Sequence, residues 1–222
     1  MKIVKKQKTL IDSVKKLKEI PEIKLKVDRR MHELYKTRDS HPEVWFSELC
    51  FCLLTANAKA RTAIAIQQEL GFDGFSKLKE PELVQSIRNN KHRFHNVKAK
   101  NIIRAREHID IRDKLIPILG DGDLNSQRLT RDWLKENIHG YGYKESSHFL
   151  RNIGYFDLAI LDRHVFALLE DFDYINKRPK NINKDVYEKH EDIVLDISEQ
   201  VDMIPAELDF YLWYMKGGDI LK

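Results

Sequence analysis

The 222-residue sequence contains only two cysteines, nine glycines and six prolines. Two cysteines, Cys50 and Cys52, are too few for a disulfide scaffold or a four-thiolate metal site, and core packing is the expected role of both. The sparse glycine and proline leave no long flexible linker and no low-complexity tract. The longest purely apolar run, at residues 49–54, is far shorter than the roughly 20 residues that span a bilayer. The Lys-rich N-terminus lacks the apolar stretch of a secretory signal. We therefore expect an intracellular protein of a reducing compartment, without membrane contact.

Apolar residues are abundant enough to build a core. Hydrophobic residues make up 42% of the sequence and charged residues 33%, which excludes a disordered chain. The length favours one compact unit or two closely packed lobes. No repeat of 20–50 residues is visible.

The formal net charge of +4 hides a strong asymmetry along the chain. Residues 1–30 hold eleven Lys and Arg but four Asp and Glu, a net charge of +7, which leaves residues 31–222 at −3. A second basic stretch, 88–106, contains seven Lys and Arg, two histidines and no acid. Clustered charge of this kind suits a polyanion, although a solvated surface explains it equally well.

The apolar periodicity is helical almost throughout and predicts an all-α fold. Pro21 should end a first helix carrying Leu10, Val14 and Leu17, and only residues 23–27 alternate with a period of two. Gly71 is expected to end a helix that begins near Ala60. The other predicted helices are 42–54, which is apolar on most faces, and then 82–88, 97–108, 113–119, 126–137, 144–153, 163–170, 184–200 and 205–216.

One segment between two predicted helices contains candidate functional residues. Gly140-Tyr-Gly142-Tyr-Lys144 forms a tight, low-bulk turn, which allows backbone amides at the start of the next helix to approach a phosphate. A helix-hairpin-helix element grips DNA in this way without reading bases, although an ordinary helix–helix turn also uses glycine. Lys144 lies at the entry of that helix, where the helix dipole favours the neutral amine that a lysine nucleophile needs. A phosphate-binding or simply solvated lysine is the alternative.

An acidic residue follows eighteen positions later. Asp162 comes after an apolar run and precedes Arg163 and His164. Asp is a favoured N-cap, so a purely structural role at the start of helix 163–170 is expected. A carboxylate that faces Lys144 and stabilises positive charge on a sugar carbon is the functional alternative, and the two roles are compatible.

Gly140-Tyr-Gly142-Tyr-Lys144, followed by Asp162-Arg-His164, resembles the helix-hairpin-helix DNA glycosylase superfamily. In particular it looks like the archaeal-type (type 2) 8-oxoguanine DNA glycosylase/lyase branch. The resemblance extends from about residue 42 to 222, with its specific part at 138–165. It implies two packed helical lobes with the active site in the cleft between them, within a single glycosylase unit spanning residues 1–222. The hairpin would occupy about 131–153, with the N- and C-terminal helices packed around it.

The resemblance also implies roles for individual residues. Lys144 would attack C1′ of the deoxyribose, expel 8-oxoguanine, form a Schiff base and cleave the strand by β-elimination, while Asp162 stabilises the cationic sugar. The other residues implied are Trp213, Lys222 and Phe94 for the base pocket, and Gly140, Gly142, His164, Asn57 and Arg93 for DNA contact. The local sequence allows an alternative role for two of these residues: Trp213 could be a core residue, and Asn57 could be the N-cap of the following helix.

The implied partner is double-stranded DNA containing 8-oxoguanine, bound by a monomer in the cytoplasm and, during repair, at the nucleoid. No cofactor or catalytic metal is implied, and a monovalent cation held by hairpin carbonyls is the one candidate ion. Two other functions fit the residues: a glycosylase/lyase for a different damaged base, since Lys144 and Asp162 fix the mechanism and not the substrate, and a non-catalytic DNA-binding module. A phosphate grip requires no acid at position 162, which counts against the second.

Overall fold

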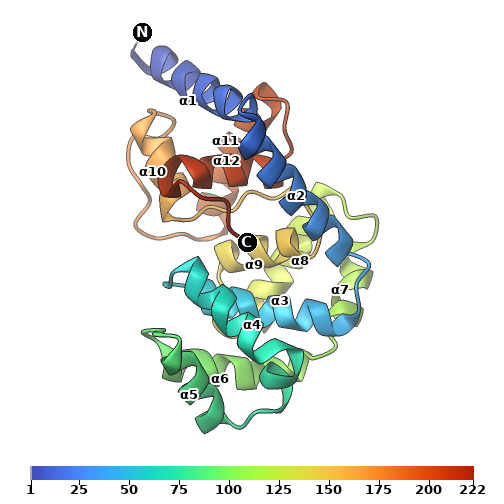
Figure 1. Ribbon diagram of the computed structural model, residues 1–222. Helices are drawn as coiled ribbons and strands as arrows, with labels where there is room; N and C mark the ends of the chain where they lie inside the picture. Colours follow the sequence, from blue (N-terminus) through green and yellow to red (C-terminus); the bar gives the residue numbers. More distant parts are fainter. Residues whose placement is uncertain (1) are drawn as a thin grey trace. The chain divides into compact units, whose positions relative to one another are not determined.

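A computed structural model describes the backbone of residues 2–222 and the side chains from Leu10 onward. Every regular element in this described part is a helix (Figure 1), as the periodicity predicts. In chain order they are α1 (Lys2–Lys18), α2 (Pro21–Thr37), α3 (Pro42–Thr55), α4 (Ala60–Lys77), α5 (Glu80–Asn89), α6 (His95–Ala105), the 3₁₀ turn η1 (Arg106–His108), α7 (Ile111–Leu119), α8 (Leu124–Asn137), α9 (Tyr143–Asn152), α10 (Arg163–Asp171), α11 (Lys184–Gln200) and α12 (Pro205–Gly217).

One segment differs from its sequence pattern, and two predicted helix boundaries are confirmed. The period-two segment at 23–27 is helical: it lies in α2, where Ile23 and Val27 are buried four residues apart and Leu25 is exposed. Gly71 ends the first helical segment of α4, as expected: its φ of 53° and ψ of −165° are not helical, and a second helical segment follows this break up to Lys77. Pro21, predicted to stop the first helix, also begins the second, because proline suits the first turn of a helix.

The chain divides into two compact units. The terminal unit comprises Met1–Glu33 and Phe156–Leu221, and the central unit comprises Leu34–Tyr155 together with Lys222. In the terminal unit α12 packs against α1, α10 and α11. The predicted hairpin region, about 131–153, lies entirely within the central unit.

Helix α3 is the centre of the central unit. Its residues from Trp45 to Thr55 are buried except Ser47, and it contacts α4, α6, α7 and α9. A helix that is apolar on most faces must be covered on most faces, which is what the sequence of α3 predicts. Cys50 and Cys52 are both buried and unpaired in α3, which confirms their role in packing.

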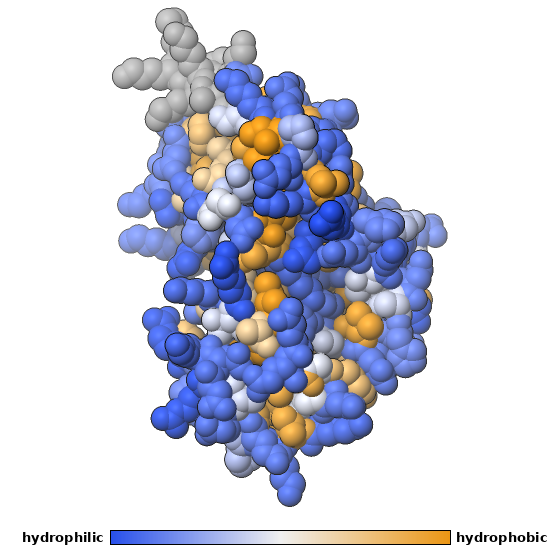
Figure 2. Space-filling model, in the orientation of Figure 1, coloured by the Kyte–Doolittle hydropathy of each residue, from blue (hydrophilic) through white to orange (hydrophobic). Residues whose placement is uncertain are grey.

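The surface seen in Figure 2 is largely hydrophilic, with separate hydrophobic patches. Among the described residues, no helix is both long enough and apolar enough to cross a membrane.

The basic segments are only partly open to solvent. Within 1–30 the side chains of residues 1–9 lie outside the described part, whereas further along Lys24 pairs with Asp28 and Arg30 pairs with Glu33. In the stretch 88–106, Lys98 is buried, and Arg106 donates hydrogen bonds to the carbonyls of two residues in the α4–α5 region. The exposed basic residues of this stretch are Arg88, Lys91, Arg93, Lys100 and Arg104.

Candidate active site

The turn between α8 and α9 forms a helix-hairpin-helix element. Gly140 has a φ of +97°, and a Cβ at this position would overlap Nδ2 of Asn101 on α6. A side chain here would be strained by the positive φ and would force the buried Asn101 side chain to move. The next residue, Tyr141, fixes the turn to the core, because its hydroxyl donates a hydrogen bond of 2.9 Å to the carbonyl of Leu49 in α3.

Gly142 is the N-cap of α9 and has an extended backbone, with φ of −113°. Its N–H donates a hydrogen bond of 3.3 Å to Oε2 of Glu145, so a carboxylate of the same helix lies at this helix start. A carboxylate in the first turn is stabilised by the positive end of the helix dipole. A DNA phosphate that used the amide of Gly142 would have to compete with Glu145.

Lys144 is the second residue of α9 and is partly buried. Its Nζ lies 3.4 Å from Nδ1 of His148, one turn further along the helix. The His148 ring stands edge-on to Phe51 of α3, with the ring centres 5.8 Å apart. Burial lowers the pKa of Lys98 on α6, and the charge of Lys144 adds to this effect while Glu145 opposes it.

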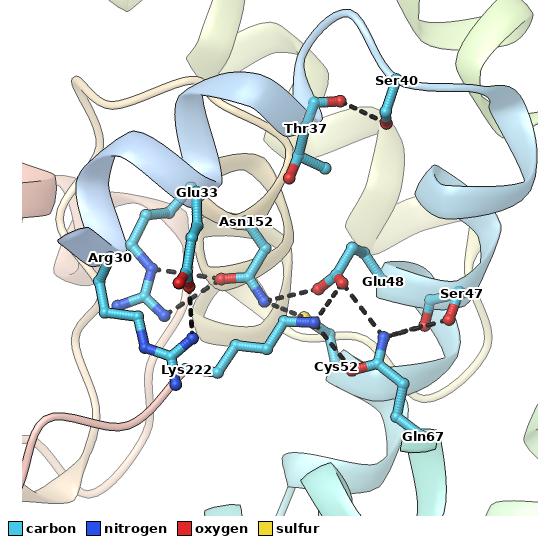
Figure 3. Close-up of polar contacts among 11 residues, drawn as sticks. Arg30, Glu33, Thr37, Ser40, Ser47, Glu48, Cys52, Gln67, Asn152 and Lys222 are labelled. Carbon is cyan, nitrogen blue, oxygen red and sulfur yellow. Dashed lines mark hydrogen bonds and ion pairs between the residues drawn. The ribbon is translucent and has the colours of Figure 1, made fainter. Parts of the chain in front are cut away.

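Lys222 lies against the same aromatic ring. Its Nζ is 4.8 Å from the centre of Phe51, donates a hydrogen bond of 2.8 Å to Oε1 of Gln67 and forms an ion pair with Glu48. Figure 3 shows Glu48 between Lys222, Gln67 and Asn152. The amides of Gln67 and Asn152 donate to the two Glu48 oxygens at 3.1 and 3.0 Å, so this buried carboxylate is fully engaged.

The start of α6 is joined to the end of α3 by a buried histidine. His92 is 2% exposed; its Nε2 lies 2.9 Å from the carbonyl of Leu54, and its Nδ1 accepts a hydrogen bond of 3.1 Å from the Phe94 N–H. Both contacts together define a neutral ring with its proton on Nε2. Burial lowers the pKa of His92, and the neighbouring charges of Lys98 and His95 act in the same direction.

This histidine fixes the backbone next to Arg93, a predicted DNA-contact residue, and Phe94, a predicted base-pocket residue. Phe94 is 36% exposed, and the guanidinium of Arg93 lies 4.4 Å from the centre of its ring. Asn57, in the turn after α3, is exposed and has a left-handed backbone with φ of 58°. The N-cap of α4 is Lys59, so the alternative that made Asn57 the N-cap is wrong.

In the terminal unit, Asp162 caps α10 as expected. Its Oδ1 accepts hydrogen bonds from the N–H groups of His164 and Val165, at 2.7 and 2.9 Å. The apolar run before it is held by α11: the Tyr187 hydroxyl donates to the carbonyl of Ala159 at 2.9 Å, and Glu191 accepts from the Ala159 N–H at 3.2 Å. These bonds fix the chain that delivers Asp162 to the helix start.

Asp162, His164 and Trp213 gather in the terminal unit. The rings of His164 and Trp213 are 5.6 Å apart with an interplanar angle of 64°. Trp213 is only partly buried, whereas its neighbour Leu212 is 3% exposed. Trp213 thus keeps part of its indole at the surface, in contrast to a residue of the closed core.

The structure brings the predicted residues together in two groups. Lys144 and Lys222 lie about Phe51 and His148 in the central unit, and Asp162, His164 and Trp213 gather in the terminal unit. That Asp162 faces Lys144 stays a prediction. The roles of the other residues in DNA contact and base binding also stay predictions.

Sequence reasoning missed Glu48, Gln67, Asn152 and His148. A signal for Glu48 was present, since it is the only charged residue from position 44 to 58. A buried acid in an apolar helix needs partners. His148 was also detectable, because it lies four residues after Lys144 on one helical face.

An all-helical chain with a helix-hairpin-helix element and a part-buried lysine at the start of its second helix has the architecture of the helix-hairpin-helix DNA glycosylases. Two solved structures confirm the class. The 8-oxoguanine glycosylase/lyase of Methanocaldococcus jannaschii, in complex with a 15-mer DNA containing 8-oxoguanine, matches with a TM-score of 0.89 and 41% identity, covering 96% of this chain and 100% of that one. The 8-oxoguanine DNA glycosylase of Thermotoga maritima matches with a TM-score of 0.89 and 34% identity, covering 97% and 100%.

Sequence comparisons agree with the structural ones. The family model described as 8-oxoguanine DNA glycosylase matches residues 27–203. The protein of M. jannaschii named 8-oxoguanine DNA glycosylase/AP lyase is 41% identical over 211 residues, or 94% of this chain and 99% of that protein. A protein of the same name from Thermoplasma volcanium is 38% identical and covers 90% of this chain and 94% of its own. The chain belongs to the 8-oxoguanine DNA glycosylase family.

Replacing Gly140 with alanine should destabilise the protein by about 2 to 4 kcal/mol, because the new Cβ would combine a strained positive φ with overlap on Asn101. Chemical denaturation measures the loss. Gly120→Ala is the matched control, since Gly120 has a φ of +47° but nothing within 4 Å of the added Cβ. Equal losses in the two variants would contradict the steric role of Asn101.

The neutral state of His92 should make stability fall as pH falls. Its pKa is lowered in the folded protein, so below about pH 6.5 the unfolded chain binds the proton first and is favoured. One such group contributes a slope of at most about 1.4 kcal/mol per pH unit. Denaturation curves between pH 7.5 and 5 should give a shallower slope for His92→Asn than for the wild type. The exposed His139, replaced with asparagine, is the control; a His92→Asn slope equal to the wild-type slope would refute the assignment.

Proposed function

We propose that this chain excises 8-oxoguanine from duplex DNA and then cleaves the abasic strand, with Lys144 as the nucleophile. Membership of the 8-oxoguanine DNA glycosylase family makes the chain a DNA glycosylase and AP lyase of base excision repair. The observation that carries the assignment of the nucleophile is the position of Lys144 at the start of α9, directly after the hairpin glycines and in hydrogen-bond contact with His148.

The amine of Lys144 would attack C1′ as the bond from C1′ to the base breaks, and the base departs with the bonding electrons. Opening of the sugar ring then gives a Schiff base between Nζ and C1′. This imine acidifies the C2′ proton, and its removal expels the 3′ phosphate by β-elimination. No redox step occurs in this sequence, and the amine itself replaces an activated water, so we propose that no cofactor takes part.

Asp162 would stabilise the positive charge that develops on the sugar. One of its oxygens, Oδ1, accepts the two N–H groups at the start of α10. The carboxylate is therefore held in a fixed orientation by its capping role, and structure and electrostatics act together in one residue.

The other predicted residues would contact the DNA backbone or the flipped base. His164, Arg93 and Asn57 would meet the DNA, with Gly140 and Gly142 offering backbone to a phosphate or to a monovalent cation on hairpin carbonyls. Trp213, Phe94 and Lys222 would line the base pocket. A part-exposed indole against an imidazole, and an exposed phenyl under a guanidinium, are surfaces on which a flipped base could stack.

The main alternative is a glycosylase/lyase that acts on a different damaged base, because the lysine chemistry does not select the base. The relatives compared above carry 8-oxoguanine in their names, which favours this lesion. We further propose that the enzyme acts as a monomer in the cytoplasm, at the nucleoid, since its substrate is genomic DNA.

Borohydride reduction should trap a covalent adduct between the wild-type protein and a duplex containing one 8-oxoguanine, because it reduces the Schiff base. Lys144→Gln should abolish the adduct, seen as a loss of the shifted band on a denaturing gel. Lys135→Gln is the matched control, since Lys135 lies on α8 with its Nζ 5.4 Å from the Tyr143 ring. No wild-type adduct despite DNA binding would defeat the enzymatic assignment, and an adduct with another lesion alone would change the substrate.

Asp162→Asn should slow base excision at least about 100-fold while leaving stability within roughly 0.5 kcal/mol, because asparagine still caps a helix but carries no charge. Single-turnover excision rates and thermal melts measure the two effects. Asp162→Ala, which removes the cap as well, should lose about 1 kcal/mol. If Asp162→Asn loses stability and DNA binding as much as activity, Asp162 is a cap alone.

A further inference from the structure

His148 is a buried polar residue for which the sequence predicts no role. It lies on α9 one turn after Lys144, is 7% exposed, and has its Nδ1 3.4 Å from Lys144 Nζ. Residues four apart share a helical face, so this contact needs no distant element to form. Hydrogen bonds at reacting groups are often long before substrate binds.

The surroundings of His148 keep its ring neutral and oriented. Burial holds the pKa of His148 well below its usual value, and the positive charges of Lys144, Arg151 and Lys222 act in the same direction. The edge-on contact with Phe51 fixes the plane of the ring. While Lys144 is an ammonium, which has three donors and no acceptor, Nδ1 accepts from it and the ring proton is on Nε2.

We propose that His148 is a positioning residue for the nucleophile, holding Lys144 Nζ through the hydrogen bond to its Nδ1; this rests on the proposed function. A lysine side chain has four rotatable bonds, and the contact restricts where its Nζ can lie. When Lys144 is a neutral amine, donation of one N–H to Nδ1 turns the nitrogen lone pair away from the imidazole. The lone pair is then free to attack, and the entropy cost of orienting it is met before substrate arrives.

The same surroundings make His148 a weak base for the deprotonation of Lys144. A ring that is buried among three cationic side chains binds a proton poorly. His148 therefore orients the amine of Lys144, and a different group removes the proton from the Lys144 ammonium.

Two variants of similar size separate the hydrogen bond from the packing. Asn places its side-chain oxygen near the position of Nδ1, whereas Gln places its amide near the position of Nε2. His148→Gln should lower the single-turnover rate of 8-oxoguanine excision about 10- to 100-fold, the usual effect of a misplaced reacting group. His148→Asn should stay within about threefold of the wild type. DNA affinity and melting temperature should be alike in the two variants.

Equal rates in the two variants, whether both fast or both slow, would overturn the proposal. So would a rate loss in His148→Gln that is matched by its loss of DNA affinity. If the variants do not fold, the nitrogen NMR shifts of the histidine rings in the wild type and in Lys144→Gln decide. The Nδ1 shift of His148 should change when the lysine is replaced, and an unchanged shift would overturn the contact.

These outcomes are distinct from failure of the proposed function. A wild-type protein that forms no adduct with any lesion duplex defeats the glycosylase mechanism, while the NMR comparison still reports the contact between Lys144 and His148. A wild-type protein that forms the adduct, together with His148→Gln at the wild-type rate, leaves the mechanism intact and removes only the positioning role.

Discussion

The burial of α3 is the constraint on which the central unit depends. From Trp45 onward almost every side chain of this helix is removed from solvent. The hydrophobic effect can stabilise such a helix only if neighbours cover it on nearly every face. The helices α4, α6, α7 and α9 provide this cover, so the position of α9, and with it that of Lys144, follows from an apolar pattern that contains no functional residue.

Polar residues fix the details that apolar packing leaves open. Apolar contacts are non-directional, so they do not define how α9 is rotated about its own axis. The bond from Asn152 to the buried Glu48 joins the last residue of α9 to α3, and the bond from Tyr141 to the Leu49 carbonyl joins the turn before α9 to α3. A slip of α9 along α3 would separate the buried Asn152 amide from Glu48 and the buried Tyr141 hydroxyl from the Leu49 carbonyl, at a cost of about 1 to 3 kcal/mol for each unsatisfied group.

The sequence predicts the helices well, since their caps and periodicity are local. Pro42, Asp162 and the glycines of the hairpin each identify a helix boundary that the structure confirms. Contacts between distant segments are a different matter. Nothing local to Glu48 indicates Lys222 or Asn152, because those partners depend on tertiary packing. The N-cap alternative for Asn57 is wrong for a different, local reason: a left-handed turn and an N-cap favour the same residue type.

The charge pattern acquires a different meaning once burial is known. The sum of charges suggests a basic surface, yet Lys98 is buried beside Lys144 and Arg106 is committed to carbonyls of its own chain. Around His148 the cations Lys144, Arg151 and Lys222 are gathered within one unit. Like charges repel where water screens them poorly, and the ion pair of Lys222 with the buried Glu48 offsets part of that repulsion. The cations that a count of charges would assign to the surface are therefore partly used inside the fold, which is why net charge alone describes the surface of this protein poorly.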